Sequence, residues 1–512
     1  MIIPILAKIK EYSVIKKDKI ACKFSDDCIS YYELERETNI IAYKIHRLLK
    51  KKQEPIIIYQ KRNPQFVKYM ISVLKCGCYY IPLEHNVPAE RVKYIYNDIN
   101  AKLIITDKQA SFDSNKYNLA FFEEIENVSN DISLNIELHP SDLVYVMYTS
   151  GTAGKPKGVK ITHSNLANLI EAFYPIVYRN FEEDISVGVL SSFSFDASVK
   201  QIYCSLYYGH KLCIAENGTR NFGRKIHTFH IENKLSICDA TPSHINLMAM
   251  QNTKNTSDIP YILIGGELLR WETLHKYIQF TSCMTTFINV YGPTECCVDA
   301  AYKIISEEDL DKHLTGIVPI GKSIINTELT IRSEAGFIID DFDKEGELFI
   351  SGKQVGLGYV NVSTDAFIKE GDLTLYKTGD IAYRNSENDI VVIGRKDTQI
   401  KMNGYRIELN EIQVLIENYM KCFCAVVFME QAIGGKIIAF ICNTQLDEGA
   451  KNDLKDYLSH VLPGYMLPNH YTFISSLPLS NNGKLDNEKL KHLYETSIEK
   501  SDQKRRLNEL LF

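Results

Sequence analysis

The sequence predicts an α/β protein: a large N-terminal domain with parallel-rich sheets and flanking helices, followed by a small, mobile α+β C-terminal domain. Two observations carry this prediction. Short apolar runs that favour strands alternate with longer stretches of helical character, which is typical of parallel sheets joined by crossover helices. In addition, 512 residues are too many for a single hydrophobic core, so more than one domain is expected. The alternation is clearest in strand-like residues 55–59, 102–106 and 143–148 and helix-like residues 65–75 and 90–99.

The domain boundary is expected next to Gly394. Polar and glycine-containing residues gather at 385–389, directly before Gly394, and the chain changes character afterwards, with short strand-like runs such as residues 425–428. A long flexible linker is absent from this part of the sequence. We therefore expect residues 1–394 to form the large domain and residues 395–512 the small one, with a hinge between them.

The composition is typical of a soluble protein of the cytoplasm. Hydrophobic residues make up 45% and charged residues 24% of the chain, and 58 Lys+Arg against 64 Asp+Glu give a formal charge of −6. This mild acidity argues against a nucleic-acid partner, which requires a concentrated basic face. The nearest pairs among the 13 cysteines lack zinc or thioredoxin-like spacing, and unpaired thiols at this density fit a reducing compartment. No apolar run reaches the ~18 residues of a membrane span, so no membrane partner is expected.

The strongest motif is Tyr-Thr-Ser-Gly-Thr-Ala-Gly-Lys-Pro-Lys-Gly at residues 148–158, directly after the apolar run 143–147. Its hydroxyls, backbone amides and two lysines form a composition that suits a phosphate-binding loop. It is not a Walker loop, because Lys155 is followed by Pro156 instead of Ser or Thr. A flexible surface turn is the alternative, but such a turn does not need this density of donors after a buried strand.

This segment resembles the phosphate-binding loop of adenylate-forming enzymes, and in particular the adenylation domains of nonribosomal peptide synthetases. Further motifs of that family follow in the family's order over almost the whole chain. Any one of them alone is weak, whereas the ordered set is decisive. They are residues 30–34 (SYYEL), 74–83 (LKCGCYYIPL), 195–198 (FDAS), 289–295 (NVYGPTE), 346–352 (GELFISG), 376–380 (YKTGD), 394–404 (GRKDTQIKMNG), 462–468 (LPGYMLP) and 478–484 (PLSNNGK).

The resemblance implies ATP and Mg²⁺ as cofactors and assigns their contacts to matching positions. Tyr291 matches the ring that stacks on adenine, and Glu295 matches the residue that helps to hold Mg²⁺, as a carboxylate beside a triphosphate requires. The ATP phosphates would be held by Thr149, Ser150, Gly151, Thr152 and Lys157. The other nucleotide contacts would be Gly292, Thr294 at the α-phosphate, Asp380 at the ribose hydroxyls and Arg395 beside it.

The catalytic residues implied by the resemblance are Lys484, Lys157 and Thr152. Lys484 matches the lysine of the small domain that bridges the substrate carboxylate and the nucleotide. A lysine in a glycine-bearing loop near a C-terminus is usually solvated, so this assignment depends on the resemblance. Asp397 matches the hinge at which the small domain turns between two poses.

The implied reaction has two steps. The substrate carboxylate attacks the α-phosphorus of MgATP and releases pyrophosphate, and a carboxylate needs no protein base for this attack. A phosphopantetheine thiol then attacks the acyl-adenylate and expels AMP. Because residues 497–512 are too few for a carrier domain, we expect a free-standing enzyme that loads a carrier protein in trans.

Asp196 matches the carboxylate that binds the α-ammonium group of an amino-acid substrate, which favours an amino acid over a fatty or aryl acid. Lys200 lies four residues later, on the same face if a helix starts there, so it either pairs with Asp196 or awaits an anionic side chain. The aligned substrate positions resemble the family's glutamate signature. These positions are Asp196, Ala197, Lys200, Asp239, Leu263, Gly265, Val290, Val298 and Asp299, with Lys484.

Within this set, Asp239 and Asp299 are expected to orient Lys200, and the small Gly265 to leave depth for a side chain with two methylenes. One lysine and two further acids are nearly balanced in charge, so glutamine is the competitor of glutamate. Two other functions stay open: an acyl-CoA or amide-forming ligase of the same fold, and a nucleotide-binding regulatory relative without turnover.

Overall fold

The computed structural model describes residues 4–107, 112, 116–122, 132–151, 154–250, 259–279, 285–371, 373–430, 435–443, 448–478, 485–486 and 488–496. The chain divides into two compact units. The first unit comprises residues 1–85, 92–149 and 157–397, and the second comprises residues 86–91, 150–156 and 398–512. The main break thus falls after Asp397, three residues beyond the expected boundary, and two short N-terminal segments group with the second unit.

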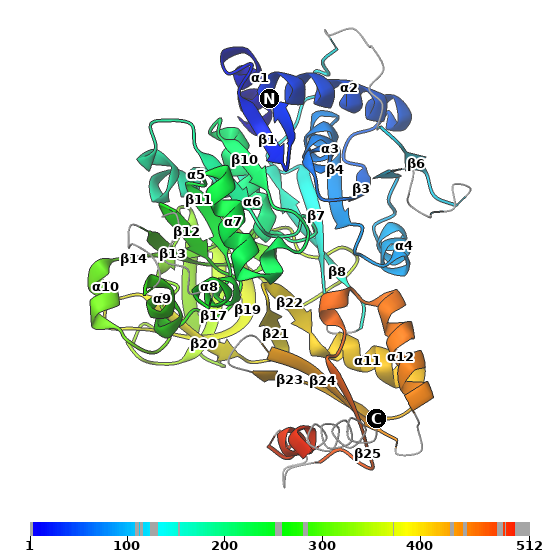
Figure 1. The fold of residues 1–512 in the computed structure, drawn as a ribbon, viewed down its shortest axis with the longest axis vertical. Helices are drawn as coiled ribbons and strands as arrows, with labels where there is room; N and C mark the ends of the chain where they lie inside the picture. The colour runs from blue at the N-terminus through cyan, green and yellow to red at the C-terminus, as the bar shows by residue number, and fades with distance from the viewer. Residues whose placement is uncertain are drawn as a thin grey trace, which may run out of the picture. The chain divides into compact units, whose positions relative to one another are not determined.

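The first unit contains two parallel-rich sheets, which confirms the predicted fold class (Figure 1). The larger sheet has nine strands, and its central strands pair in parallel, whereas the strands at both edges pair antiparallel. Its order is β15 (Lys322–Ser323), β14 (Ala301–Ile305), β13 (Thr286–Tyr291), β12 (Tyr261–Ile264), β11 (Ile237–Ala240), β9 (Ser186–Val189), β10 (Lys211–Ile214), β1 (Ile20–Phe24) and β2 (Asp27–Ser30).

The second parallel-rich sheet has six strands, and a third, antiparallel sheet has five. The six-stranded order is β6 (Leu119–Ala120), β5 (Leu103–Thr106), β3 (Pro55–Gln60), β4 (Tyr79–Glu84), β7 (Leu143–Thr149) and β8 (Lys157–Thr162). The antiparallel sheet consists of β16 (Thr327–Arg332), β17 (Gly346–Gly352), β19 (Leu373–Arg384) and β18 (Phe367–Glu370), with β20 (Ile390–Arg395) paired to β19.

The helices of the first unit begin where the sequence supplies capping groups. Asn63 accepts a hydrogen bond from the amide of Phe66 at the start of α3, and Pro64 occupies the first turn, where no backbone donor is needed. The helices are α1 (Pro4–Ile15), α2 (Tyr31–Leu49), α3 (Pro64–Lys75), α4 (Ala89–Asp98, whose first turn groups with the second unit), α5 (His163–Ile176), α6 (Ala197–Tyr207), α7 (Gly223–Asn233), α8 (Pro242–Ala249), α9 (Trp271–Ile278) and α10 (Glu307–Lys312), with 3₁₀ turns η1 (Tyr178–Asn180), η2 (Thr219–Asn221) and η3 (Thr294–Cys296).

One hydrophobic core joins the two parallel-rich sheets through helices α2, α3, α5 and α6. Within it, the Tyr203 hydroxyl of α6 donates to the Tyr80 hydroxyl of β4 at 2.8 Å, which ties a helix of one sheet to a strand of the other. Helices α7, α8 and α9 pack on the nine-stranded sheet around a second core (Figure 1). The carboxyl ends of β11, β12 and β13 therefore meet at one edge, where ligands of open α/β sheets bind.

The second unit is α+β. A two-stranded hairpin leads into helix α11, which packs against strand β23 of a three-stranded sheet and against helix α12. Residues 488–496 are also helical. Its elements are β21 (Gln399–Met402), β22 (Tyr405–Glu408), α11 (Leu409–Met420), β23 (Cys424–Glu430), β24 (Gly435–Cys442), α12 (Glu448–Val461), η4 (Gly464–Met466) and β25 (His470–Ile474).

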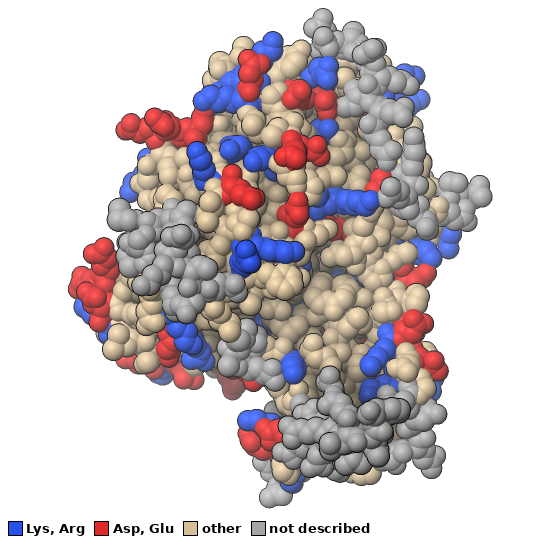
Figure 2. Space-filling view, viewed as in Figure 1, with Lys and Arg blue, Asp and Glu red and all other residues tan. Residues whose placement is uncertain are grey.

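Among the described residues, no helix combines the length and the apolar character that a membrane crossing requires. On the face that Figure 2 shows, Lys and Arg side chains are interspersed with Asp and Glu side chains. Asp184, for example, forms ion pairs with both Lys16 and Lys19.

Phe66 provides a test of the main core. Its ring is fully buried and meets Phe193 edge to face, with ring centroids 5.2 Å apart. We expect Phe66→Ala to lower the free energy of unfolding by about 3–5 kcal/mol, because it removes this contact and leaves a cavity. Phe337→Ala, at a residue that is 75% exposed, is the matched control and should change stability by less than about 0.5 kcal/mol. Equal losses in urea unfolding for the two variants would contradict this assignment of the core.

Candidate functional site

Three of the predicted nucleotide residues form one hydrogen-bonded group in the first unit. Tyr291 ends β13, while Asp380 in β19 and Arg395 in β20 are paired residues of the antiparallel sheet. The Tyr291 hydroxyl donates to Asp380 Oδ2, and Arg395 donates to Asp380 Oδ1 at 2.7 Å. Burial, and next the charge of Asp380, raises the pKa of Tyr291 well above its usual value, so the phenol stays a donor. Each Asp380 oxygen keeps a second acceptor position for a ligand hydroxyl.

Asp397 holds the other side of the Arg395 guanidinium. Arg395 Nε and its second terminal nitrogen donate to the two Asp397 carboxylate oxygens, each at 2.7 Å. This two-pronged geometry fixes the guanidinium plane between Asp380 and Asp397. Asp397 is also the last residue of the first unit, at the position where a hinge is predicted.

A second group surrounds Glu295, which lies in η3 and is 1% exposed. The Tyr359 hydroxyl donates to Glu295 Oε1 at 2.5 Å, and the ring of Tyr359 lies under the Lys157 ammonium, 5.2 Å from ring centre to Nζ. Thr149 is the strand partner of Lys157 in the β7–β8 pair. The structure thus brings Glu295 and Lys157 to Tyr359, a residue that sequence reasoning missed because it belongs to none of the motifs.

Ser150 and Gly151 of the phosphate-binding motif belong to the second unit. Ser150 Oγ donates to the Arg406 carbonyl at 3.0 Å and accepts from the Glu408 amide at 3.1 Å. The Gly151 amide donates to Glu411 Oε2 at 3.1 Å, so a carboxylate already accepts from this loop. Thr152 and Lys484 lie outside the described residues, and their predicted roles stay predictions.

The segment after Tyr291 has an unusual backbone. Cys297 and Val298 have φ values of 46° and 76°, and a β-branched residue rarely adopts this region. Gln354 Nε2 holds the Cys297 carbonyl at 2.8 Å, and the Ala300 amide donates to the Tyr291 carbonyl at 2.7 Å. Neighbouring contacts therefore fix a strained conformation, which is common at binding sites.

The same turn requires a glycine at position 292, because its backbone leaves no space for a side chain there. A Cβ at this position would stand 2.2 Å from the Val298 carbonyl oxygen and 2.7 Å from the Asp299 Cα. Only glycine allows the two arms of the turn to approach this closely. Thr294, two residues later, is buried in η3.

Lys200 is the centre of a buried ionic group that we call the Lys200 cluster, namely Lys200, Asp239 and Asp299. Lys200 Nζ lies 2.7 Å from Asp299 Oδ2 and 3.1 Å from Asp239 Oδ2, and it also faces the ring of Phe173 at 4.8 Å. Lys200 is 2% exposed. The structure thus pairs Lys200 with the two acids expected to orient it, and the lysine is already ion-paired within the protein.

Burial acts differently on the pKa values of the acid and the lysine in the Lys200 cluster. Burial raises the pKa of Asp239 to about 7, with Lys200 lowering it and Asp299 raising it further. The pKa of Lys200 is raised by both carboxylates although burial acts to lower it, so the lysine stays charged. Asp239 Oδ1 is buried and has no hydrogen-bond partner in the described part of the chain. At neutral pH, Lys200 is therefore a cation, whereas the Asp239 carboxylate is easily protonated.

The other predicted substrate positions lie at the start of α6, in β12 and β13, and in the segments that follow these two strands. Asp196 is the N-cap residue of α6 and Ala197 begins that helix. Leu263 of β12 is the register partner of Asp239 in β11. A Cβ at Gly265 would stand 2.7 Å from Val290 Cγ2, so Val290 packs directly against this glycine. The two residues meet because β12 and β13 are adjacent, and the depth expected at Gly265 for a substrate side chain stays a prediction.

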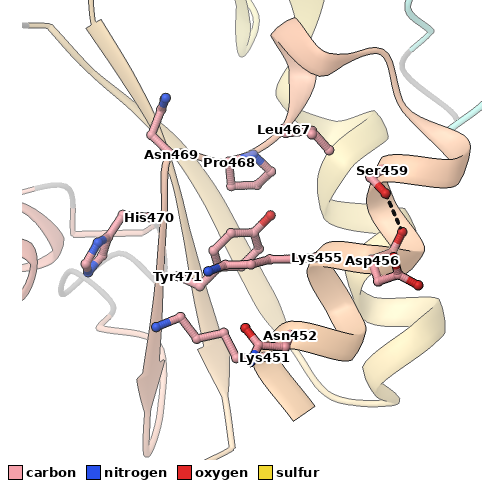
Figure 3. A pocket seen from close by; sticks show the side chains of 10 residues that line it. All are labelled: Lys451, Asn452, Lys455, Asp456, Ser459, Leu467, Pro468, Asn469, His470 and Tyr471. Carbon is pink, nitrogen blue, oxygen red and sulfur yellow. Dashed lines mark hydrogen bonds between the residues drawn. The ribbon is translucent and has the colours of Figure 1, made fainter. Parts of the chain in front are cut away.

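A separate cavity of about 530 Å³ lies in the second unit, between α12 and the start of β25 (Figure 3). None of the predicted site residues lines it. Burial, and next the charges of Lys451, Lys436 and Lys455, lowers the pKa of His470 at this cavity.

Comparisons with known proteins identify relatives of this chain in sequence and in fold. The sequence model of the family described as AMP-binding enzyme matches residues 11–360. The chain is 32% identical to zwittermicin A synthase ZmaJ of Bacillus cereus, over 95% of this chain and 94% of that protein. It is 31% identical to surfactin synthase subunit 1 of Bacillus subtilis, over 94% of this chain but only 14% of that much longer protein. The fold is similar to that of the adenylation domain AlmE of Vibrio cholerae, solved with glycyl-adenosine-5'-phosphate, at a TM-score of 0.82 and 22% identity over 96% of this chain and 97% of that one.

The close approach at Gly292 gives a prediction. We expect Gly292→Ala to lower the free energy of unfolding by about 1–3 kcal/mol, because the added methyl overlaps the Val298 carbonyl and forces the strained turn to move. Gly394→Ala is the matched control, since no atom lies within 4 Å of its added Cβ. Urea unfolding measures both variants, and a stable Gly292→Ala protein would show that the turn has freedom to relax.

Proposed function

The chain belongs to the AMP-binding enzyme family, and from this premise we propose that it activates L-glutamate. The α-carboxylate reacts with ATP to form glutamyl-AMP and pyrophosphate, and the acyl group then passes to the phosphopantetheine thiol of a carrier protein in trans. The fold shared with AlmE, which was solved with an aminoacyl-adenosine phosphate, supports an aminoacyl-AMP as the intermediate.

The observation that carries the choice of substrate is the buried Lys200 cluster beside Asp196. A lysine that is 2% exposed is costly to bury and indicates a site that handles charge. Asp196 lies near enough to Tyr145 and Cys297 to raise the pKa of both, after the larger effect of burial. One anion at the start of α6 and one cation a turn later match an α-ammonium group and an anionic side chain on the same ligand.

In the first step an α-carboxylate oxygen forms a bond to the α-phosphorus, and the bond to the departing pyrophosphate breaks. The carboxylate is ionised at neutral pH, so no proton is removed and no base is needed. Asp196 would hold the ammonium group and Asp380 the ribose hydroxyls, which fixes the two reactants relative to each other. Lys157 and Lys484 would neutralise the charge that develops on the phosphates, and Thr152 would donate a hydrogen bond to it.

The residues present fit a magnesium ion. Mg²⁺ binds through one or two carboxylates and takes its other ligands from substrate phosphates and water. Glu295 supplies one buried carboxylate, whose orientation is fixed by the hydroxyl of Tyr359. When bound, the ion would neutralise part of the phosphate charge.

In the second step the thiolate of the carrier forms a bond to the acyl carbon, and the bond to AMP breaks. The thiol proton leaves to solvent, and AMP departs as a phosphate monoester. We propose Asp397 as the hinge at which the small domain turns between the two steps. The unit boundary at this residue supports that role.

Glutamine is the second candidate substrate, and one observation favours it. Lys200 already has two carboxylate partners at 2.7 and 3.1 Å, so an uncharged amide avoids adding a third anion. An acyl-CoA or amide-forming ligase of the same fold would not need an acid at Asp196.

The test is amino-acid-dependent ATP–pyrophosphate exchange with Mg²⁺, across the common amino acids, D-glutamate and a few fatty and aryl acids. We expect exchange with L-glutamate at least about tenfold above every other acid, since one charge-matched contact contributes about 1.5–3 kcal/mol. A glutamine maximum would retain amino-acid activation and overturn the choice of side chain. Exchange with only a fatty or aryl acid would overturn the role of Asp196.

Asp380 gives a prediction on the nucleotide side. We expect Asp380→Asn to lower kcat/KM for ATP by about 10- to 100-fold, because the amide loses a charged acceptor for the ribose and for Arg395. Asp341→Asn, at a surface side chain that is 76% exposed, is the control and should leave kcat/KM unchanged. Pyrophosphate exchange at varied ATP measures both. An unaltered KM for ATP in the Asp380→Asn enzyme would exclude this carboxylate from the nucleotide site.

A further inference from the structure

We propose that Asp239 is the proton-carrying specificity residue of the Lys200 cluster: an anionic side chain binds there together with one proton taken up by Asp239, whereas a neutral amide binds without one. This inference rests on the proposed function, because it concerns the side-chain end of the substrate that is activated. It goes beyond that function by naming the protonation state that decides between the acid and the amide.

The charge count of the cluster requires such a proton. With both acids ionised, one lysine faces two carboxylates, so the buried group carries one net negative charge. A glutamate side chain would bring a third carboxylate to a single cation. Carboxylates that share a buried site cannot all ionise, and one of them takes up a proton. A glutamine side chain brings no charge and has no such requirement.

Geometry selects Asp239 as the acid that receives the proton. Asp299 makes the shorter contact to Lys200, at 2.7 Å, whereas Asp239 makes the longer one, at 3.1 Å. Asp239 is only 9% exposed, and its Oδ1 has no hydrogen-bond partner among the residues that the structure describes. A proton on Oδ1 would turn this unsatisfied acceptor into a donor to the substrate carboxylate, while Oδ2 keeps its contact to Lys200.

The pKa of Asp239 supports this assignment, since burial raises it to about 7. The groups that face Asp239 are Lys200 and Cys204 of α6, Tyr178 of η1, Cys238 of β11 and Asp299. Burial raises the pKa of Tyr178, Cys204 and Cys238, so these three stay neutral near pH 7. Lys200 stays charged for the opposite reason, because its two carboxylates raise its pKa.

The sign of the pH dependence follows directly. If glutamate requires Asp239 protonated, its KM is lowest below the pKa of Asp239 and rises as the pH passes that value. With a pKa of about 7, the KM for glutamate divided by the KM for glutamine should rise about tenfold between pH 6 and pH 8. The ratio isolates the side chain, because both substrates use the same ATP site and the same ammonium and carboxylate contacts.

The experiment measures both KM values by ATP–pyrophosphate exchange at pH 6, 7 and 8, in the wild-type enzyme and in Asp239→Asn. The wild type should show the tenfold rise, and Asp239→Asn should show a flat ratio because an amide cannot ionise. Asp239→Glu, which keeps a carboxyl group, should retain a slope. As a measurement that needs no variant, calorimetry of L-glutamate binding with α,β-methylene-ATP in buffers of different ionisation enthalpy should show uptake of about one proton at pH 8.

The outcomes separate the two proposals. Exchange with glutamate and a flat ratio in the wild type, or no proton uptake in calorimetry, would overturn the role of Asp239 and leave glutamate activation intact. A slope that persists in Asp239→Asn would assign the proton to another group and equally overturn it. No exchange with glutamate at any of these pH values would overturn the proposed function, and this inference with it.

Discussion

A buried lysine needs carboxylate partners, and several elements of the first unit together bring two carboxylates to Lys200. Its ammonium group lies in α6, yet its two carboxylates come from β11 and from the turn after β13. Removing both acids would leave an unpaired cation in a region of low dielectric, which is among the costlier changes a core can undergo. The parallel register of β11, β12 and β13, the turn at Gly292 and the left-handed Val298 all serve to bring these groups within 3.1 Å. The strain in the turn is compensated by this pairing and by hydrogen bonds from the rest of the unit.

The predicted nucleotide residues are also held by partners that come from distant parts of the chain. Asp380 is held by Tyr291 from the nine-stranded sheet and by Arg395 from the antiparallel sheet, so one carboxylate couples two sheets. Glu295 is held in a similar manner by Tyr359. In both cases a ligand would meet a carboxylate whose orientation is already fixed, which reduces the reorganisation required on binding.

Sequence reasoning reached the fold class and most of the members of these groups, and its limits have physical causes. The alternation of strand-like and helix-like runs follows from side-chain periodicity, which is local, so the parallel-rich α/β class could be predicted. The motifs marked Tyr291, Glu295, Asp380 and Arg395 by their neighbours in the chain. Tyr359 belongs to no motif and touches Glu295 only through folding across 64 residues, so no local pattern could have revealed it. The depth expected at Gly265 stays a prediction, because the small size of a residue indicates free space only when the neighbouring side chain is known, and here that neighbour is Val290.

The sequence by itself determined the order of elements, the phosphate-binding motif and the identity of the charged residues, because these depend on residue type and spacing along the chain. Only the tertiary structure shows the contacts by which those charges are satisfied. The four-residue spacing left Asp196 open as a partner of Lys200, while the resemblance gave Asp239 and Asp299 as the acids that orient it. The folded chain brings these two acids to the ammonium group, across 39 and 99 residues of sequence. It also leaves Asp239 Oδ1 buried with no hydrogen-bond partner among the described residues. Burial and long-range contact set the protonation of such a group, and neither quantity is encoded in any short stretch of the chain.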